Sequence, residues 1–235
     1  MGCCDVQDEP NPNSPEDGPV TSAEHHAIAA ELAASGTVLL KNDGDLLPIR
    51  LGDAHGVEEQ INIALIGHEA LGTTVGGGGS GGVNPSNFST PKDLIRKRAG
   101  ITGNGDCTAS GNVCVRFQNV QEEADIDLAR KLALRSTHVF VFVATDSMEG
   151  ADRDNLSLES SCQTDKMSKF GLPVCDNTVQ HESQDALINS VVEVVGEKTA
   201  VIAVAPGALL TPWAEQTAAV LISFMPGQAY AEGEW

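Results

Sequence analysis

The side chains best suited to chemistry lie at residues 146–158, directly after an apolar run at 138–145. Within this stretch Glu149, Asp152 and Arg153 bring two carboxylates and a guanidinium close together along the chain. A buried parallel strand that ends in charge and glycine is where α/β proteins place their chemistry. If any residue here is catalytic, Glu149 is the candidate to test. From the residues alone, the favoured interpretation is a solvated loop carboxylate without a chemical role.

Apolar runs of strand length recur along the chain and alternate with helical patterns. The runs lie at 61–66, 139–144, 199–205 and 219–224, with a weaker one at 113–117. The helical patterns lie at 22–36, 91–99, 122–136 and 183–195, and the segment 37–42 turns toward 46–49. Unbroken apolar runs between such helices predict an α/β fold, a three-layer sandwich whose mostly parallel sheet of about five to six strands is flanked by helices.

The first residues differ in composition from the rest of the chain. Between residues 5 and 19 almost all side chains are polar, acidic, proline or glycine, and so few apolar groups cannot offset the entropy of ordering the segment. We predict a flexible linker at 1–21 and one folded domain at 22–235. No basic-then-apolar secretory leader is visible, so we expect either a cytosolic protein or one whose true start lies upstream.

The chain is strongly acidic, with 33 Asp and Glu against 14 Lys and Arg and a formal net charge of -19. Such a charge repels nucleic acids and anionic membranes. No apolar stretch approaches the roughly 20 residues that a membrane-spanning helix needs. We therefore expect neither nucleic acid nor a membrane as a partner, and a neutral or cationic partner fits better. The interpretation that we favour, however, is that the acidity serves solubility alone.

A glycine-rich loop at residues 76–82 follows the first apolar run. Gly77, Gly79 and Gly82 satisfy the dinucleotide-binding pattern G-x-G-x-x-G. In that motif the glycines come directly at a strand-to-helix turn, whereas here about ten residues separate them from Ile66. We expect a flexible loop over a neutral ligand or a neighbouring domain, with a plain connecting loop and nucleotide binding as alternatives.

The six cysteines fall in three pairs along the chain. Cys107 with Cys114, and Cys162 with Cys175, sit in polar loops where short disulfides could close, which hints at an oxidising compartment and a secreted protein. Unrelated reduced thiols are the alternative interpretation. None of the cysteine spacings matches a zinc site and the six histidines share no ligand spacing, so we expect neither a metal nor another cofactor.

Several short motifs follow one another in order along most of the chain. They lie at His26, 30–42, 47–48, 63–67, the glycine loop with Thr90 and Pro91, Glu149 and Gly150, Asp152 and Arg153, Leu156 and Leu158, Gln184, Leu187 and Ile188, Pro212 and Trp213, and 226–228. Together they resemble the C-terminal α/β sandwich domain of glycoside hydrolase family 3. This family contains many β-glucosidases, β-xylosidases and exo-glucanases.

The resemblance implies half of a retaining exo-acting β-glycosidase, most often a β-glucosidase, that hydrolyses terminal non-reducing β-linked sugars without a cofactor. In the family the cleft lies between an N-terminal barrel, which supplies an Asp nucleophile, and this sandwich, which often supplies the acid/base Glu. By this correspondence Glu149 is the acid/base. Asp152, Arg153 and Ser80 would bind substrate or position the loop. The substrate would be an oligosaccharide or an aryl or alkyl β-glycoside.

The chain departs from the family pattern in two ways. No barrel precedes the linker, so we expect the nucleophile in a barrel domain outside these residues and an isolated chain that is nearly inactive. The stretch 159–183 is longer than usual, and we expect the domain to be incomplete after 226–228. The alternative function is a non-catalytic carbohydrate-binding or interdomain scaffold module. Aromatic residues at only 4% argue against independent sugar binding, and Trp213 is expected in the core or between domains.

Overall fold

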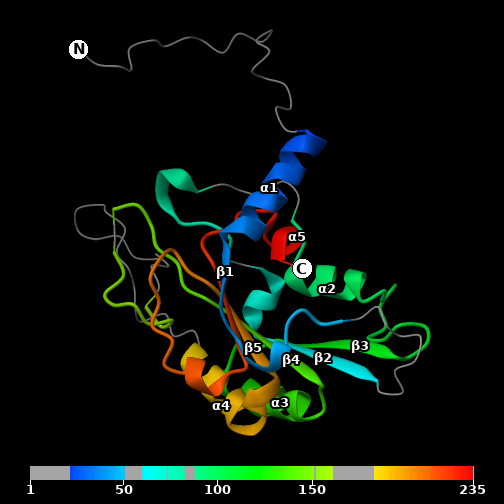
Figure 1. The fold of residues 1–235 in the computed structure, drawn as a ribbon. Coiled ribbons are helices and arrows are strands. Elements are labelled where there is room, and N and C mark those ends of the chain that lie inside the picture. The colour runs from blue at the N-terminus through cyan, green and yellow to red at the C-terminus, as the bar shows by residue number, and fades with distance from the viewer. Residues whose placement is uncertain are drawn as a thin grey trace, which may run out of the picture.

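The computed structural model describes residues 22–50, 60–72, 74–82, 88–150, 152–160 and 183–234. The predicted linker at 1–21 lies outside the described residues, as do Cys162 and Cys175. Six strands of the described residues form one sheet in the order β1-β6-β5-β4-β2-β3 (Figure 1). The strands are β1 Thr37–Asn42, β2 Ile61–Ile66, β3 Val113–Gln118, β4 His138–Ala144, β5 Thr199–Val204 and β6 Ala219–Ser223.

All neighbouring strands run parallel except β1, which pairs antiparallel with β6. The prediction of an α/β fold with a mostly parallel sheet flanked by helices is confirmed, and the segment after the first helix adds an edge strand. The α-helices are α1 Ala23–Gly36, α2 Pro91–Arg98, α3 Glu123–Leu134, α4 Gln184–Val195 and α5 Tyr230–Glu234. Short 3-10 helices are η2 Asp43–Asp45, η3 His68–Leu71, η4 Gly79–Gly81, η5 Gly196–Lys198 and η6 Ala214–Gln216.

Three of the helices begin at side-chain caps that are visible in the sequence. The hydroxyls of Ser22, Thr90 and Ser183 each accept a hydrogen bond from the backbone N–H three residues further on. Such a cap satisfies an N–H that has no partner within the helix. Pro91 follows its cap at the first helical position, where a missing N–H costs nothing. The starts of α1, α2 and α4 are therefore fixed locally.

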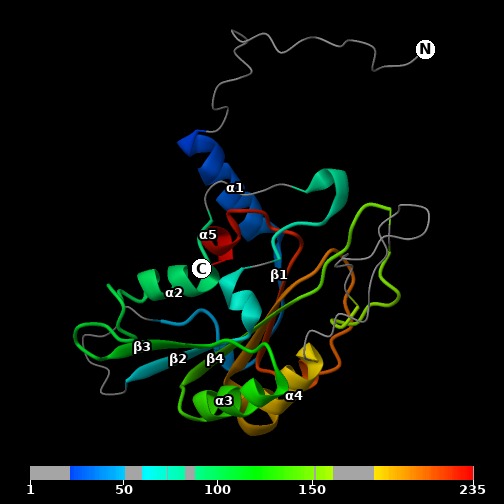
Figure 2. The ribbon, with the colours of Figure 1, turned by 180° about the vertical axis from the view of Figure 1, so that it is seen from behind.

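Two apolar layers attach the helices to opposite faces of the sheet. On one face Ala129 of α3 and Val191 of α4 share a buried cluster with strand residues such as Val141. On the other face Ile95 of α2 packs in a second cluster with Leu65. Figures 1 and 2 show α3 and α4 together on one side, and α2 with α1 and α5 on the other. This three-layer arrangement covers both faces of the sheet and leaves the ends of the strands uncovered.

Trp213 is a core residue. Its side chain is fully buried in the layer that contains α3 and α4. The indole Nε1 donates a hydrogen bond to Asp185 Oδ1 at 2.9 Å, which satisfies the only polar atom of the ring. Trp213 is therefore a structural residue rather than a platform for stacking a sugar.

Candidate active site

The sheet changes its direction of winding between β2 and β4. The chain leaves β2 for the edge strand β3, and then returns to β4 on the other side of β2. Of the two connecting helices, α2 packs on one face of the sheet and α3 on the other. The segments that follow β2 and β4 therefore lead to helices on opposite faces of the sheet, α2 and α4. Open α/β sheets bind their ligands at such a switch point.

The glycine loop after β2 is held against the segment after β4. The backbone N–H of Gly78 donates to the Ser147 carbonyl at 3.0 Å, and that of Glu149 donates to the Gly78 carbonyl at 3.3 Å. Together these bonds form a short parallel bridge between Gly78 and Met148. The described part of the loop thus differs from the predicted flexible loop, because its backbone is paired.

Glycine is required where the two segments touch. Gly79 has a φ of +88°, and a Cβ added there would lie 2.5 Å from the Cβ of Glu149. A Cβ on Gly78 would lie 3.0 Å from the Cβ of Met148. The loop then enters η4, a single turn, whereas a dinucleotide site needs a longer helix to face the pyrophosphate. The glycines therefore allow close backbone approach and do not form a dinucleotide site.

Glu149 is exposed, and its carboxylate is held by Ser80 of the glycine loop. The backbone N–H of Ser80 donates to Glu149 Oε2 at 2.8 Å, and the Ser80 hydroxyl donates to the same oxygen. The hydroxyl and then the backbone N–H lower the pKa of Glu149, because both bonds favour the ionised carboxylate. In this arrangement Glu149 is a carboxylate at neutral pH.

Ser80→Ala should raise the pKa of Glu149 toward its ordinary value, because the largest cause of the lowered pKa is removed. The measurement is an NMR titration of the Glu149 carboxyl in the 235-residue chain. Ser110→Ala, which changes a hydroxyl bonded to Thr108, is the matched control. By linkage, the stabilisation from the Ser80–Glu149 bonds is present above the ordinary carboxyl pKa and is lost as the pH falls through the lowered one. An unchanged or lower pKa in Ser80→Ala would contradict this assignment.

Arg153 connects the segments that follow β4 and β5. Its Nη2 donates to the Ala208 carbonyl at 2.9 Å, and its Nη1 lies 3.5 Å from Thr145 Oγ1. Burial lowers the pKa of Arg153, and the charge of Asp146 opposes that effect. Asp152 is exposed beside it. The structure therefore shows Arg153 bonded to neighbouring loops, whereas Ser80 and Glu149 are joined by direct hydrogen bonds.

Gln184 organises the exit of β4, a role that its place in the sequence motif did not reveal. Its amide exchanges two hydrogen bonds with the backbone of Ala144, at 2.9 Å to the N–H and 2.7 Å to the carbonyl. Nε2 also lies 3.3 Å from the Leu158 carbonyl. The Gln184 side chain thus bonds to the backbone at the end of β4 as a neighbouring strand would, at the point where the chain leaves the sheet toward Glu149. In the sequence, the available signal for this role was the position of Gln184 directly after the helix cap Ser183.

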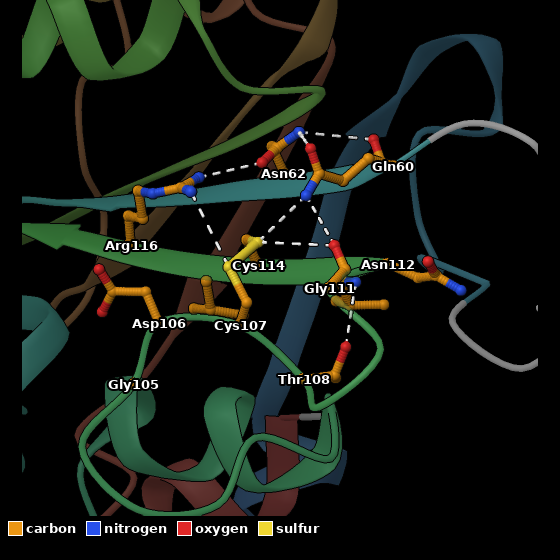
Figure 3. The surroundings of a disulfide bond; sticks show 12 residues. Gln60, Asn62, Gly105, Asp106, Cys107, Thr108, Gly111, Asn112, Cys114 and Arg116 are labelled. Carbon is orange, nitrogen blue, oxygen red and sulfur yellow. Dashed lines mark hydrogen bonds between the residues drawn. A yellow bond between two sulfur atoms is a disulfide. The ribbon is translucent and has the colours of Figure 1, made fainter.

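Cys107 and Cys114 form a disulfide at the edge strand β3 (Figure 3). The disulfide belongs to the hairpin before β3 and not to the segments that carry Ser80 and Glu149. Within the described ranges, no group of three or more His, Cys, Asp or Glu side chains could hold a metal ion. The described helices are also all too short or too polar to cross a bilayer.

Comparison with known proteins identifies relatives along most of the chain. The family profile described as the glycosyl hydrolase family 3 C-terminal domain matches residues 37–233. The thermostable β-glucosidase B of Acetivibrio thermocellus is 27% identical over 221 residues, which is 92% of this chain and 25% of that protein. A probable β-glucosidase of Arthroderma benhamiae is 33% identical over 185 residues, 68% of this chain and 20% of that protein. The chain thus spans a quarter or less of the length of these relatives.

Solved structures show the same fold. The β-glucosidase DesR of Streptomyces venezuelae matches 92% of this chain and 37% of its own, with a TM-score of 0.64 at 22% identity. The β-glucosidase of Bifidobacterium adolescentis matches 94% of this chain and 27% of its own, with a TM-score of 0.65 at 20% identity. The family profile and the shared fold agree. The chain belongs to glycosyl hydrolase family 3, as a C-terminal domain of that family.

Proposed function

We propose that this chain supplies one wall of the active site of a retaining, exo-acting β-glycosidase, most specifically a β-glucosidase. Its substrates would be oligosaccharides or aryl or alkyl glycosides with a terminal non-reducing β-linked sugar. The observation that carries the proposal is the position of Glu149, exposed at the switch point of the sheet and fixed by Ser80. The relatives support the substrate class, because their names are those of β-glucosidases.

Retention of configuration requires two carboxyl groups roughly 5–5.5 Å apart. One attacks the anomeric carbon and the other protonates the departing oxygen and then activates water. Glu149 suits the second role, because its exposed carboxylate faces solvent at the end of the sheet. The nucleophile would be an aspartate of a barrel domain that closes over this end of the sandwich.

The lowered pKa of Glu149 suits only half of this cycle. An ionised carboxylate can act as the general base that activates water, but the first step needs a protonated group. The approach of a negative nucleophile and the exclusion of water both raise the pKa of a carboxyl group. We therefore assign the raising of the Glu149 pKa to closure of the cleft by the second domain.

Asp152 and Arg153 are assigned to the positioning of the loop and to contacts with substrate. Arg153 already ties the Glu149 segment to the Ala208 carbonyl after β5. Through this bond the positively charged Arg153 side chain supports the loop instead of neutralising Glu149. Asp152 is exposed two residues after Gly150, in the same segment.

The 235-residue chain alone should hydrolyse a chromogenic β-glucoside no faster than its own Glu149→Gln variant, because one of the two required carboxyls is missing. The measurement is release of the chromophore by both proteins at equal concentration. Turnover on the order of 1 s⁻¹ or faster, typical of enzymes, that disappears in Glu149→Gln would contradict this account. It would show that the chain contains its own nucleophile.

The compartment is also part of the proposal. A disulfide between Cys107 and Cys114 is most stable in an oxidising environment, which supports a secreted protein. An independent sugar-binding module is less well supported. The described Trp213 and Tyr230 are both buried, so neither can stack on a sugar ring from the surface.

A further inference from the structure

The face of the sheet that carries α3 and α4 becomes polar at its outer edge. Val113 and Val115 of β3 belong to the apolar layer under α2. Because side chains alternate along a strand, Cys114, Arg116 and Gln118 face the opposite layer, the one with α3. Arg116 Nη1 donates to Asn62 Oδ1 of β2 at 3.0 Å on this face. Polar side chains therefore stand where the inner strands carry β-branched ones.

A groove of about 540 Å³ lies between this polar edge and α3. It is lined by three cations, Arg116, Lys131 and Arg135, and by three amides, Gln60, Asn62 and Gln118. Two leucines of α3 complete the lining, which includes no carboxylate. The volume falls in the range of roughly 300–1,000 Å³ that is usual for small-molecule sites.

The positive charge of this groove is not compensated within the described residues. A neighbouring groove of about 610 Å³ shares Arg116, but its other two cations have acidic partners. There Arg96 lies 3.4 Å from Asp106, and Lys92 lies 3.9 Å from Asp93. Among the described residues, none of the ion pairs involves Arg116, Lys131 or Arg135. In a chain with a net charge of -19, this concentration of unpaired cations is a local exception.

Arg116 is oriented without being neutralised. Figure 3 shows its guanidinium reaching over β2 to the Asn62 amide, with Gln60 just before that strand. Its Nη2 points to Cys107 Sγ at 3.9 Å, so the disulfide also lies against this side chain. An amide oxygen fixes the guanidinium but adds no negative charge. The side chain is therefore prepared to bind a planar oxyanion with two parallel hydrogen bonds.

We propose that this groove binds an acidic sugar, a uronate, at a site separate from Glu149. The sugar carboxylate would pair with Arg116, with Lys131 and Arg135 adding attraction. The side-chain amides of Gln60 and Gln118 donate to the Gly111 and Asn119 carbonyls at 2.6 and 2.7 Å, and their oxygens can accept from sugar hydroxyls. The leucines of α3 offer an apolar surface for the ring. The groove lies beside β3 and α3, whereas Glu149 follows β4, so the site does not depend on the proposed β-glucosidase activity.

The test is a calorimetric titration of the 235-residue chain with three probes. Glucuronate should bind in a saturable way. Glucose and inorganic phosphate should each bind at least about tenfold more weakly than glucuronate, because each supplies only half of the contacts. Binding of glucuronate should weaken as salt is added, since two of the cations are exposed. Absence of saturable glucuronate binding, or equal affinity for phosphate and glucuronate, would overturn the proposal.

Variants identify the site. Arg116→Gln should weaken glucuronate binding about tenfold or more. The double variant Lys131→Gln with Arg135→Gln should weaken it about two- to tenfold, and it leaves the buried core unchanged because both side chains are exposed. Arg98→Gln removes an exposed charge of α2 outside the groove and is the control. If Arg116→Gln does not fold, the double variant decides. Wild-type affinity in the double variant would overturn the proposal.

Discussion

Glu149→Gln, placed in a protein that joins this chain to the proposed barrel domain, should lower kcat on an unactivated β-glucoside by roughly 10²–10⁴-fold. Glutamine keeps the size of the side chain and can still accept from Ser80, but it cannot donate or accept the catalytic proton. The loss in the glycosylation step should be much smaller for an aryl glucoside with an acidic phenol, because such a leaving group needs little protonation. The measurement compares pre-steady-state rates on the two substrates.

A matched carboxylate provides the control for this experiment. Glu197 is exposed in η5, just before β5, and therefore lies at the opposite end of the sheet from Glu149. Glu197→Gln should leave both rates at the wild-type level. Equal losses on the two substrates in Glu149→Gln would assign the residue to substrate binding instead, and an unchanged kcat would remove it from the mechanism.

Gly79→Ala in the same longer protein should lower kcat/KM by about 10²-fold while the domain remains folded, because a shift of about 1 Å in a catalytic group has an effect of this size. The new Cβ would stand 2.5 Å from the Cβ of Glu149, at a φ of +88° that alanine rarely adopts. The two segments must separate, and the carboxylate must move with them. Steady-state kinetics together with thermal unfolding distinguish this local shift from general loss of structure.

Gly76→Ala is the control in the same loop. An added Cβ at Gly76 meets nothing within 4 Å, so this variant should retain wild-type kinetics. If Gly79→Ala also retained them, the pairing of the glycine loop with the Glu149 segment would have no part in catalysis. Equal losses in both variants would point to flexibility of the whole loop as the important property.

The fold could be predicted from the sequence because its signals are local. Short continuous apolar runs between helical patterns, such as 199–205, favour strands buried on both faces, and β5 is buried at all six positions. The caps Ser22, Thr90 and Ser183 fixed the starts of three helices within one turn. The family was recognised through the resemblance, whose motifs depend on their order along the whole chain, whereas the order of the strands in the sheet was not predicted from the sequence.

The candidate site was only partly predictable, because its contacts join distant parts of the chain. Glu149 stood out as a charged residue after a buried strand, but the Ser80 bond that lowers its pKa spans 69 residues. The glycine loop matched a nucleotide pattern, and only its pairing with the Glu149 segment shows why glycine is required. Gln184 bonds across 40 residues to the end of β4.

The overall charge also concealed a local feature. A net charge of -19 predicts that anions are repelled, yet three cations without acidic partners among the described residues gather beside β3. Net charge describes long-range attraction and repulsion, whereas binding depends on the groups that line one groove. Lys131 lies in α3 and Arg135 directly follows that helix, whereas Arg116 comes from a strand that only the fold brings beside them.

The proposed catalysis requires that Glu149 face a crevice that a second carboxylate enters. The most direct measurement is a crystal structure of the longer protein with glucose in the cleft. We predict that a carboxyl oxygen of Glu149 lies roughly 5–5.5 Å from that of a barrel aspartate, on opposite sides of the anomeric carbon. A barrel docked elsewhere, with Glu149 turned toward open solvent and no carboxylate within about 10 Å, a separation beyond that of either glycosidase class, would contradict it.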